Sequence, residues 1–170
     1  DVPRLRELWI ETGGFSRKSL QSIIEMKAPL LETLNVWFGK EDYGCNCEAR
    51  DVERLLSSSA SAFPKLKHLG LANCQFGNEL VPMLVRSKLS KQLESLDLSM
   101  SHLTVDGIRA LVAGKASFPK LQKLNVSRCV LDKEGVKLAK SVAKAVDVSD
   151  QYELEDYQLE EDHRYAAVGE

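Results

Sequence analysis

The apolar residues of this chain recur in a fixed pattern. The spacing Leu-x-x-Leu-x-(Leu/Ile/Val) occurs five times, and the first leucines of successive copies are 26, 35, 27 and 28 residues apart. Alternation of apolar and polar positions over a short run is typical of a half-buried β-strand. We therefore predict strands over residues 7–10, 33–36, 68–71, 95–98 and 123–126, and a sixth, terminal strand over 146–148.

A second apolar pattern, at i, i+3 and i+4, follows each of the five strands and indicates a helix. Ser16, Thr104 and Asp132 lie just ahead of three of these stripes, where an N-cap is expected. A proline precedes four of the five strands and should end the helix before it. Each unit is thus predicted to consist of a strand, a turn and a helix, in that order. The stripes are Leu20/Ile23/Ile24, Val52/Leu55/Leu56, Val81/Leu84/Val85, Ile108/Leu111/Val112 and Val136/Ala139.

These units resemble leucine-rich repeats. The clearest copies are Leu66-x-x-Leu69-x-Leu71-x-x-Cys74-x-Phe76 and Leu121-x-x-Leu124-x-Val126-x-x-Cys129-x-Leu131. The period of roughly 28 residues with a full helix resembles the ribonuclease-inhibitor type. The resemblance covers residues 3–148 and implies an α/β solenoid, an arc of a right-handed horseshoe with a parallel sheet on the concave side and helices on the convex side. Residues 34–39 with Tyr43-Gly44, and residues 164–170, resemble a bacterial leucine-rich-repeat family of unassigned function.

The domain organisation follows from this repeat. We expect a solenoid of about five repeats plus a terminal strand over residues 1–148, and an acidic C-terminal cap over 149–170. Residues 147–170 hold nine acidic residues and one basic one, yet also carry Tyr152, Leu154, Tyr157, Leu159 and Tyr165. Such apolar residues predict an ordered segment that covers Val142, Val146 and Val148. Nothing comparable precedes Pro3, so a cap is missing there or a partner protects the first repeat.

Composition narrows the possible partners. The chain has a formal net charge of −2, is 44% hydrophobic and contains no apolar run long enough to span a bilayer. We therefore expect a protein partner, and neither nucleic acid nor membrane.

The four cysteines fall into two pairs. Cys74 and Cys129 occupy a repeat position that takes small buried side chains, so we predict that both are reduced, which favours a cytoplasmic setting. Cys45 and Cys47 lie in an insertion over about residues 40–48, where we expect an exposed loop that reacts first with thiol reagents. A redox or metal role for this Cys-x-Cys pair stays open, because it lacks the further ligands of a closed zinc site.

No catalytic motif is present. The chain has no recognisable nucleophile motif and no metal-binding histidine spacing. Gly13 and Gly14 lie in a strand-to-helix turn, where backbone freedom explains them. Asp97 and Asp147 could face the same side, but a strand separates them. We therefore expect no enzyme activity, no cofactor and no metal.

The concave face is the candidate binding surface, because alternate residues of each strand point to it. Both tryptophans, Trp9 and Trp37, fall there on adjacent strands, and tryptophan is enriched at binding hot spots. The competing interpretation is that insertion residues such as Tyr43 cover them. The candidate partner-binding residues are Trp9, Glu11, Asn35, Trp37, His68, Asp97, Ser99 and Asn125.

These observations favour a non-catalytic protein-recognition module. One alternative is an accessory or structural subunit of a larger enzyme complex. Another is a metal-responsive loop formed by Cys45 and Cys47.

Overall fold

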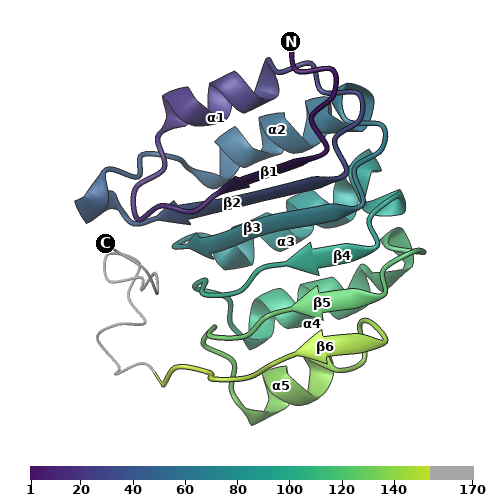
Figure 1. The fold of residues 1–170 in the computed structure, drawn as a ribbon. Helices are drawn as coiled ribbons and strands as arrows, with labels where there is room; N and C mark the ends of the chain where they lie inside the picture. The colour runs from purple at the N-terminus through teal and green to yellow at the C-terminus, as the bar shows by residue number, and fades with distance from the viewer. Residues whose placement is uncertain (154–170) are drawn as a thin grey trace.

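Six parallel strands form a single open sheet. The computed structural model describes residues 1–153. The strands follow one another in chain order, and every neighbouring pair is parallel (Figure 1). All six predicted strands are confirmed, although the second and third extend three residues further than the repeat pattern indicates. The strands are β1 (Glu7–Ile10), β2 (Thr33–Gly39), β3 (His68–Cys74), β4 (Ser95–Asp97), β5 (Lys123–Asn125) and β6 (Ala145–Asp147).

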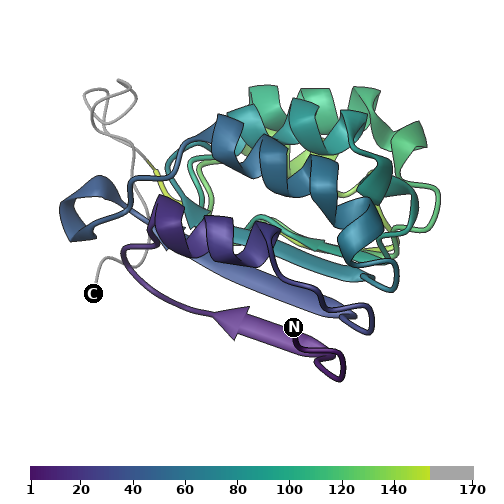
Figure 2. The ribbon, with the colours of Figure 1, turned by 90° about the horizontal axis from the view of Figure 1, so that it is seen from above.

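Each of the first five strands is followed by an α-helix, and all five helices lie on the same face of the sheet (Figure 2). This arrangement confirms the predicted α/β solenoid, with the opposite face of the sheet as its concave side. The helices are α1 (Arg17–Ile24), α2 (Ala49–Ala62), α3 (Gly77–Arg86), α4 (Val105–Ala113) and α5 (Lys133–Ala139), and short 3-10 turns cover Glu41–Tyr43 (η1), Lys88–Lys91 (η2) and Lys115–Ser117 (η3).

The predicted N-caps position three of these helices. The side chain of Ser16 accepts a hydrogen bond from the Ser19 N–H, and that of Thr104 accepts one from the Asp106 N–H. Asp132 accepts one from the Gly135 N–H at 2.7 Å. Each side chain satisfies a backbone donor that has no partner within its own helix.

The core is built from rows of repeat positions that run across the sheet. Leu34, Leu69, Leu96 and Leu124 are paired in register on neighbouring strands, and each is at most 2% exposed. Burial of such a side chain contributes about 1.5–3 kcal/mol. The equivalent residues of the two outer strands, Leu8 and Val146, are only partly buried, because each packs against one neighbouring repeat instead of two.

The insertion after β2 packs against the first repeat. A β-carbon added to Gly14 would lie 1.7 Å from the Tyr43 carbonyl oxygen, and one added to Gly39 would lie 1.6 Å from the Gly13 carbonyl oxygen. Gly39 also has a positive φ of 74°. Close backbone contact therefore explains Gly14 and Gly39, whereas the sequence indicated backbone freedom at Gly13 and Gly14.

Residues 149–153 continue the repeat by one further turn. The Tyr152 N–H donates to the Cys129 carbonyl at 2.7 Å, and the Arg128 guanidinium donates to the Tyr152 hydroxyl at 2.9 and 3.0 Å. The rest of the predicted cap, with Leu154, Tyr157, Leu159 and Tyr165, lies outside the described residues, as does the resemblance over 164–170. The boundary at residue 148 and the cap therefore stay predictions.

Candidate functional site

The concave face presents its side chains in rows, because the six strands are paired in register. One row runs through the middle of the sheet from Trp9 in β1 to Asp147 in β6. Within it, successive strands contribute Trp9, Asn35, Gly70, Asp97, Asn125 and Asp147. Six of the eight candidate binding residues lie on this face within the strands, while Glu11 follows the end of β1 and Ser99 follows the end of β4.

The two tryptophans differ in exposure. Trp9 is 56% exposed, and its indole N–H lies 3.4 Å from a carboxylate oxygen of Glu7. Trp37 is half-buried and lies two residues further along β2 than Asn35, the partner of Trp9 in register. Tyr43 is itself 47% exposed, with the Lys40 ammonium 5.3 Å from its ring centroid. The insertion therefore does not bury Trp9, which remains a large apolar surface on the concave side.

Two candidate residues have little surface to offer a partner. Asn35 is 5% exposed and Ser99 is 4% exposed. The Asn35 side chain lies over Gly70 on the neighbouring strand, and its Oδ1 accepts no hydrogen bond. Ser99 lies in the turn after β4, where its N–H donates to Asp97 Oδ1 at 2.8 Å. Local packing therefore withdraws both side chains from the surface, and their role as contact residues stays a prediction.

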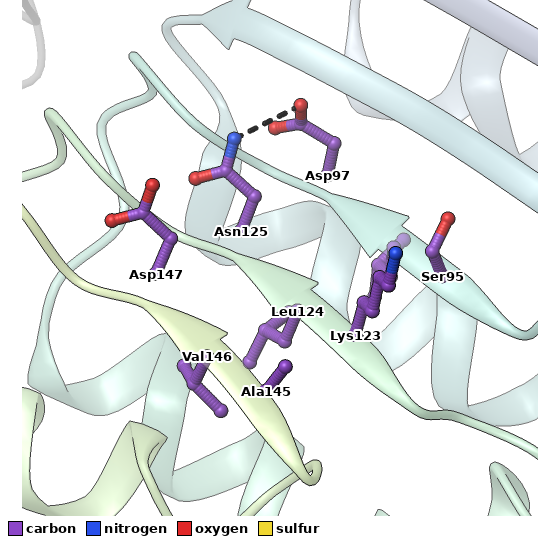
Figure 3. Close-up of a pocket in the computed structure, with 9 residues that line it drawn as sticks. Ser95, Asp97, Lys123, Leu124, Asn125, Ala145, Val146 and Asp147 are labelled. Carbon is purple, nitrogen blue, oxygen red and sulfur yellow. Dashed lines mark hydrogen bonds between the residues drawn. The ribbon is translucent and has the colours of Figure 1, made fainter.

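A shallow hollow of about 540 Å³ lies over the last three strands (Figure 3). On one side of it, Asn125 Nδ2 donates to Asp97 Oδ2 at 3.1 Å, and Asp147 lies on the next strand. The Lys123 ammonium lies toward the other side, beside Ser95 in register. The hollow therefore presents acceptors along one side and a cation on the other.

Two polar side chains of this hollow accept hydrogen bonds from the serine two residues later in the chain. Asp147 Oδ1 accepts hydrogen bonds from the Ser149 hydroxyl at 2.7 Å and the Ser149 N–H at 2.9 Å, and these lower the pKa of Asp147 below its ordinary value. Asn125 makes the same pair of hydrogen bonds with Ser127. Both side chains are thereby fixed in orientation before any partner arrives.

His68 is part of a different contact. Its Nδ1 lies 2.8 Å from the Ser95 hydroxyl, two residues toward the start of the strands from the central row. The structure thus brings Asp97 and Asn125 together and pairs His68 with Ser95. It leaves Trp9 and Glu11 exposed at the far edge.

A repeated left-handed residue was not predicted. Asn73, Met100, Arg128 and Asp150 all have φ between 51° and 57°. Each stands three residues after the central-row position of its strand, at the corner where the chain leaves the concave face. The signal that could have revealed this corner is the Asx-x-Ser motif, which recurs at 97–99, 125–127 and 147–149.

The cysteines confirm one prediction and only part of another. Cys74 and Cys129 are free and fully buried, and burial raises the pKa of each thiol to about 12. Cys45 and Cys47 are also free, but they are only 6% and 7% exposed. The insertion is an exposed loop at residues 41–44, 46 and 48, as expected, but the side chains of its two cysteines are buried against the first repeat.

Neither a metal centre nor a membrane span is found in the part of the chain that the structure describes. Within residues 1–153, no three His, Cys, Asp or Glu side chains gather where they could hold a metal ion. No helix in the same range is long and apolar enough to cross a bilayer.

Comparison with known proteins gives matches in sequence and in structure. The family model described as Leucine Rich repeat matches residues 90–112 and 119–138. The chain is similar to the crystal structure of a Bacteroides fragilis protein, with a TM-score of 0.83 and 33% sequence identity. That match covers 89% of this chain and 43% of the other, so this chain spans less than half the length of that relative.

A more distant match shows the fold alone. The chain is similar to Leiomodin-1 Actin-Binding Site 2 with a TM-score of 0.53 and 18% identity, over 79% of this chain and 78% of that one. No curated protein matches the sequence. Both segments matched by the family model lie within the repeating strand–helix units of the sheet, and these units are leucine-rich repeats.

Proposed function

We propose that the chain is a non-catalytic recognition module that binds a protein partner through the concave face of its sheet. The observation that carries this proposal is Trp9, a tryptophan 56% exposed at a strand position in register with the buried Asn35. A large aromatic side chain held on a rigid strand contributes contact area at little cost in conformational entropy. Solenoids of this kind offer extended concave surfaces for binding, which is support by analogy.

The surface offers two chemically different regions to one partner. Trp9 and the half-buried Trp37 form an aromatic region over β1 and β2. The hollow over β4 to β6 presents Asp97, Asn125 and Lys123. Between them, Gly70 and Ala72 add almost no side-chain bulk. A partner segment lying across the strands would place an apolar side chain at the first region and polar groups at the second.

Three finer features belong to this proposal. The partner is a protein rather than nucleic acid or membrane, consistent with the formal net charge of −2. The setting is reducing and cytoplasmic, supported by the four free thiols of the described residues. The repeats are of the ribonuclease-inhibitor-like type in a bacterial protein, supported by helices such as α2 and by the Bacteroides relative.

Affinity capture with matched variants tests the proposal. The intact protein and the Trp9→Ala/Trp37→Ala double variant are used as bait in a lysate of the native organism, and bound proteins are quantified by mass spectrometry. Lys18→Ala/Arg54→Ala is the matched control, because both residues are exposed and lie on helices of the convex side. We expect a specific partner to be lost about tenfold or more from the tryptophan variant and retained by the control. Equal recovery by all three baits would refute recognition through this face.

A second candidate, an accessory subunit of a larger enzyme complex, is favoured by the outer edge of β1. Among the described residues, β1 pairs with β2 alone, and Leu5, Leu8 and Ile10 are only partly buried. Sedimentation of the isolated chain separates the two candidates. Self-association or instability of the chain on its own favours the accessory role, and a stable monomer favours free recognition.

A further inference from the structure

The insertion after β2 holds two thiols in one small, well-defined pocket. Its backbone is fixed at Lys40, whose carbonyl accepts hydrogen bonds from the Tyr43 and Cys45 N–H groups, both at 3.1 Å. It is also tied to the first repeat, since the Arg17 N–H donates to Asn46 Oδ1 at 2.6 Å. The segment 45–47 is therefore a structured part of the fold with a defined position.

Both thiols of this segment line the same hollow. The hollow has a volume of about 290 Å³, and its walls also include Arg17, Glu41, Glu48 and Gln75. Cys47 Sγ lies 3.4 Å from the Phe15 carbonyl oxygen, to which it can donate. A reagent that enters this hollow meets two sulfur atoms from residues only two positions apart.

The two thiols differ in acidity. The interaction with the neighbouring Cys47 side chain lowers the pKa of Cys45 to about 7, although burial opposes this shift. The same interaction, together with burial, raises the pKa of Cys47. Near neutral pH, Cys45 therefore carries thiolate, the nucleophilic form, while Cys47 retains its proton.

We propose that Cys45 and Cys47 form a dithiol modification site that reacts with low-molecular-weight disulfides. In the first step, the Cys45 thiolate attacks one sulfur of the reagent disulfide. A Cys45–reagent disulfide forms, the reagent's own S–S bond breaks, and one reagent thiolate leaves.

In the second step, the negative charge of Cys45, which helped to raise the pKa of Cys47, is gone, and Cys47 loses its proton and attacks the Cys45 sulfur. The Cys47 proton passes to solvent, the Cys45–Cys47 bond forms, and the second reagent thiolate leaves. The two cysteines are oxidised by two electrons in total, and the reagent is reduced to two thiols. Residues two positions apart can be at most about 7 Å apart between their Cα atoms. A disulfide spans about 4.4–6.8 Å, so a bend at Asn46 is sufficient.

The other two cysteines take no part in this chemistry. Cys74 and Cys129 are fully buried, with each pKa raised to about 12, so they stay protonated at neutral pH. They serve as internal controls within the same molecule. The site is separate from the proposed concave binding surface. The two proposals are therefore tested independently of each other.

Peptide mass analysis tests the site directly. The reduced, intact protein is incubated with oxidised glutathione at pH 6, 7 and 8, quenched with an alkylating reagent and digested with trypsin. Cleavage after Lys40 and Arg50 releases peptide 41–50, which contains Cys45 and Cys47 and no other cysteine. We expect this peptide to lose two hydrogens, at a rate that rises through pH 7, while Cys74 and Cys129 are recovered as unmodified thiols.

Two single variants identify the order of the steps. Cys47→Ser should stop at the Cys45–glutathione adduct, whereas Cys45→Ser should react at least tenfold more slowly at pH 7 than the parent. Three outcomes would overturn the proposal. Peptide 41–50 could keep both thiols free under conditions that oxidise the urea-unfolded chain, Cys47 could react equally fast without Cys45, or Cys45 could be joined to Cys74 in peptide 68–86. Circular dichroism of each variant confirms that it is folded.

Discussion

The side chain of Asn35 occupies the space that Gly70 leaves on the neighbouring strand. The two residues are paired in register, and a β-carbon added to Gly70 would lie 2.1 Å from Asn35 Oδ1 and 2.8 Å from its Cγ. This contact explains both the missing side chain at Gly70 and the burial of Asn35. The two positions are therefore expected to respond to mutation as a pair.

The first prediction is that Gly70→Ala destabilises the protein by about 1–3 kcal/mol, because the added methyl group overpacks a filled site. Chemical denaturation measures the change. The double variant Gly70→Ala/Asn35→Ala should recover part of the loss, since removing the amide makes room for the methyl group. If the two changes are simply additive, the contact is not what excludes a side chain at Gly70.

The second prediction concerns the buried oxygen of Asn35, which accepts no hydrogen bond. Asn35→Leu keeps the side-chain size and removes an unsatisfied acceptor, so it should raise the free energy of unfolding by about 1 kcal/mol. The matched control is Asn125→Leu in the same row, which loses hydrogen bonds with Asp97 and Ser127 and should be destabilising. Equal losses in both variants would contradict this explanation.

The third prediction is a pH dependence that originates at the start of α2. Burial alone would raise the pKa of Asp51, but the Glu48 N–H at 3.0 Å and the Arg17 guanidinium at 2.8 Å lower it below its ordinary value. A carboxylate with a lowered pKa in the folded state contributes stability above the unfolded pKa, which is lost as the pH falls through the folded pKa. Asp51→Asn should therefore be less stable than the parent by about 1 kcal/mol at pH 7.

That difference should shrink from about pH 4 downward, because the unfolded parent takes up a proton at Asp51 there and the folded parent follows at its lowered pKa. Urea unfolding of both proteins from pH 7 to pH 2 measures it. A constant difference over the whole range would show that Asp51 does not act through its charge.

The fourth prediction is that Cys74 and Cys129 resist thiol reagents in the native protein. Both pKa values are raised to about 12 by burial. Modification of either thiol should therefore require opening of the core and accelerate steeply in urea. Mass spectrometry of the alkylated peptides gives the rates. Rapid labelling of Cys129 without denaturant would show that the last repeats open readily on their own.

The periodic parts of this structure could be predicted from the sequence because they depend on local spacing. The strand positions, the helix stripes and the Ser16, Thr104 and Asp132 caps each follow from residues a few positions apart. The exposure of Trp9 could not be decided in the same way. It depends on where the insertion packs, and the sequence left open whether Tyr43 covers it.

The unexpected burial of some side chains arises from contacts between distant positions. Cys47 is buried against the Phe15 carbonyl, 32 residues away in the chain. Asn35 is buried because Gly70, 35 residues later, has no side chain to displace it. Neither contact leaves a signal in the spacing of residues around the site. The alternation of side chains along the strand placed Asn35 on the concave face, but it did not indicate how exposed the Asn35 side chain is.

The length of the strand pairing between β2 and β3 also determines which parts of the sheet unfold locally first. This pairing extends over six register pairs, whereas the ladders between the later strands extend over three each. In a stack whose repeats contact only their neighbours, the outer units can detach while the rest stays folded. Amide hydrogens should therefore exchange fastest in β1 and β6 and slowest in the middle of β2 and β3, so protection from exchange falls in steps from this pair toward both ends.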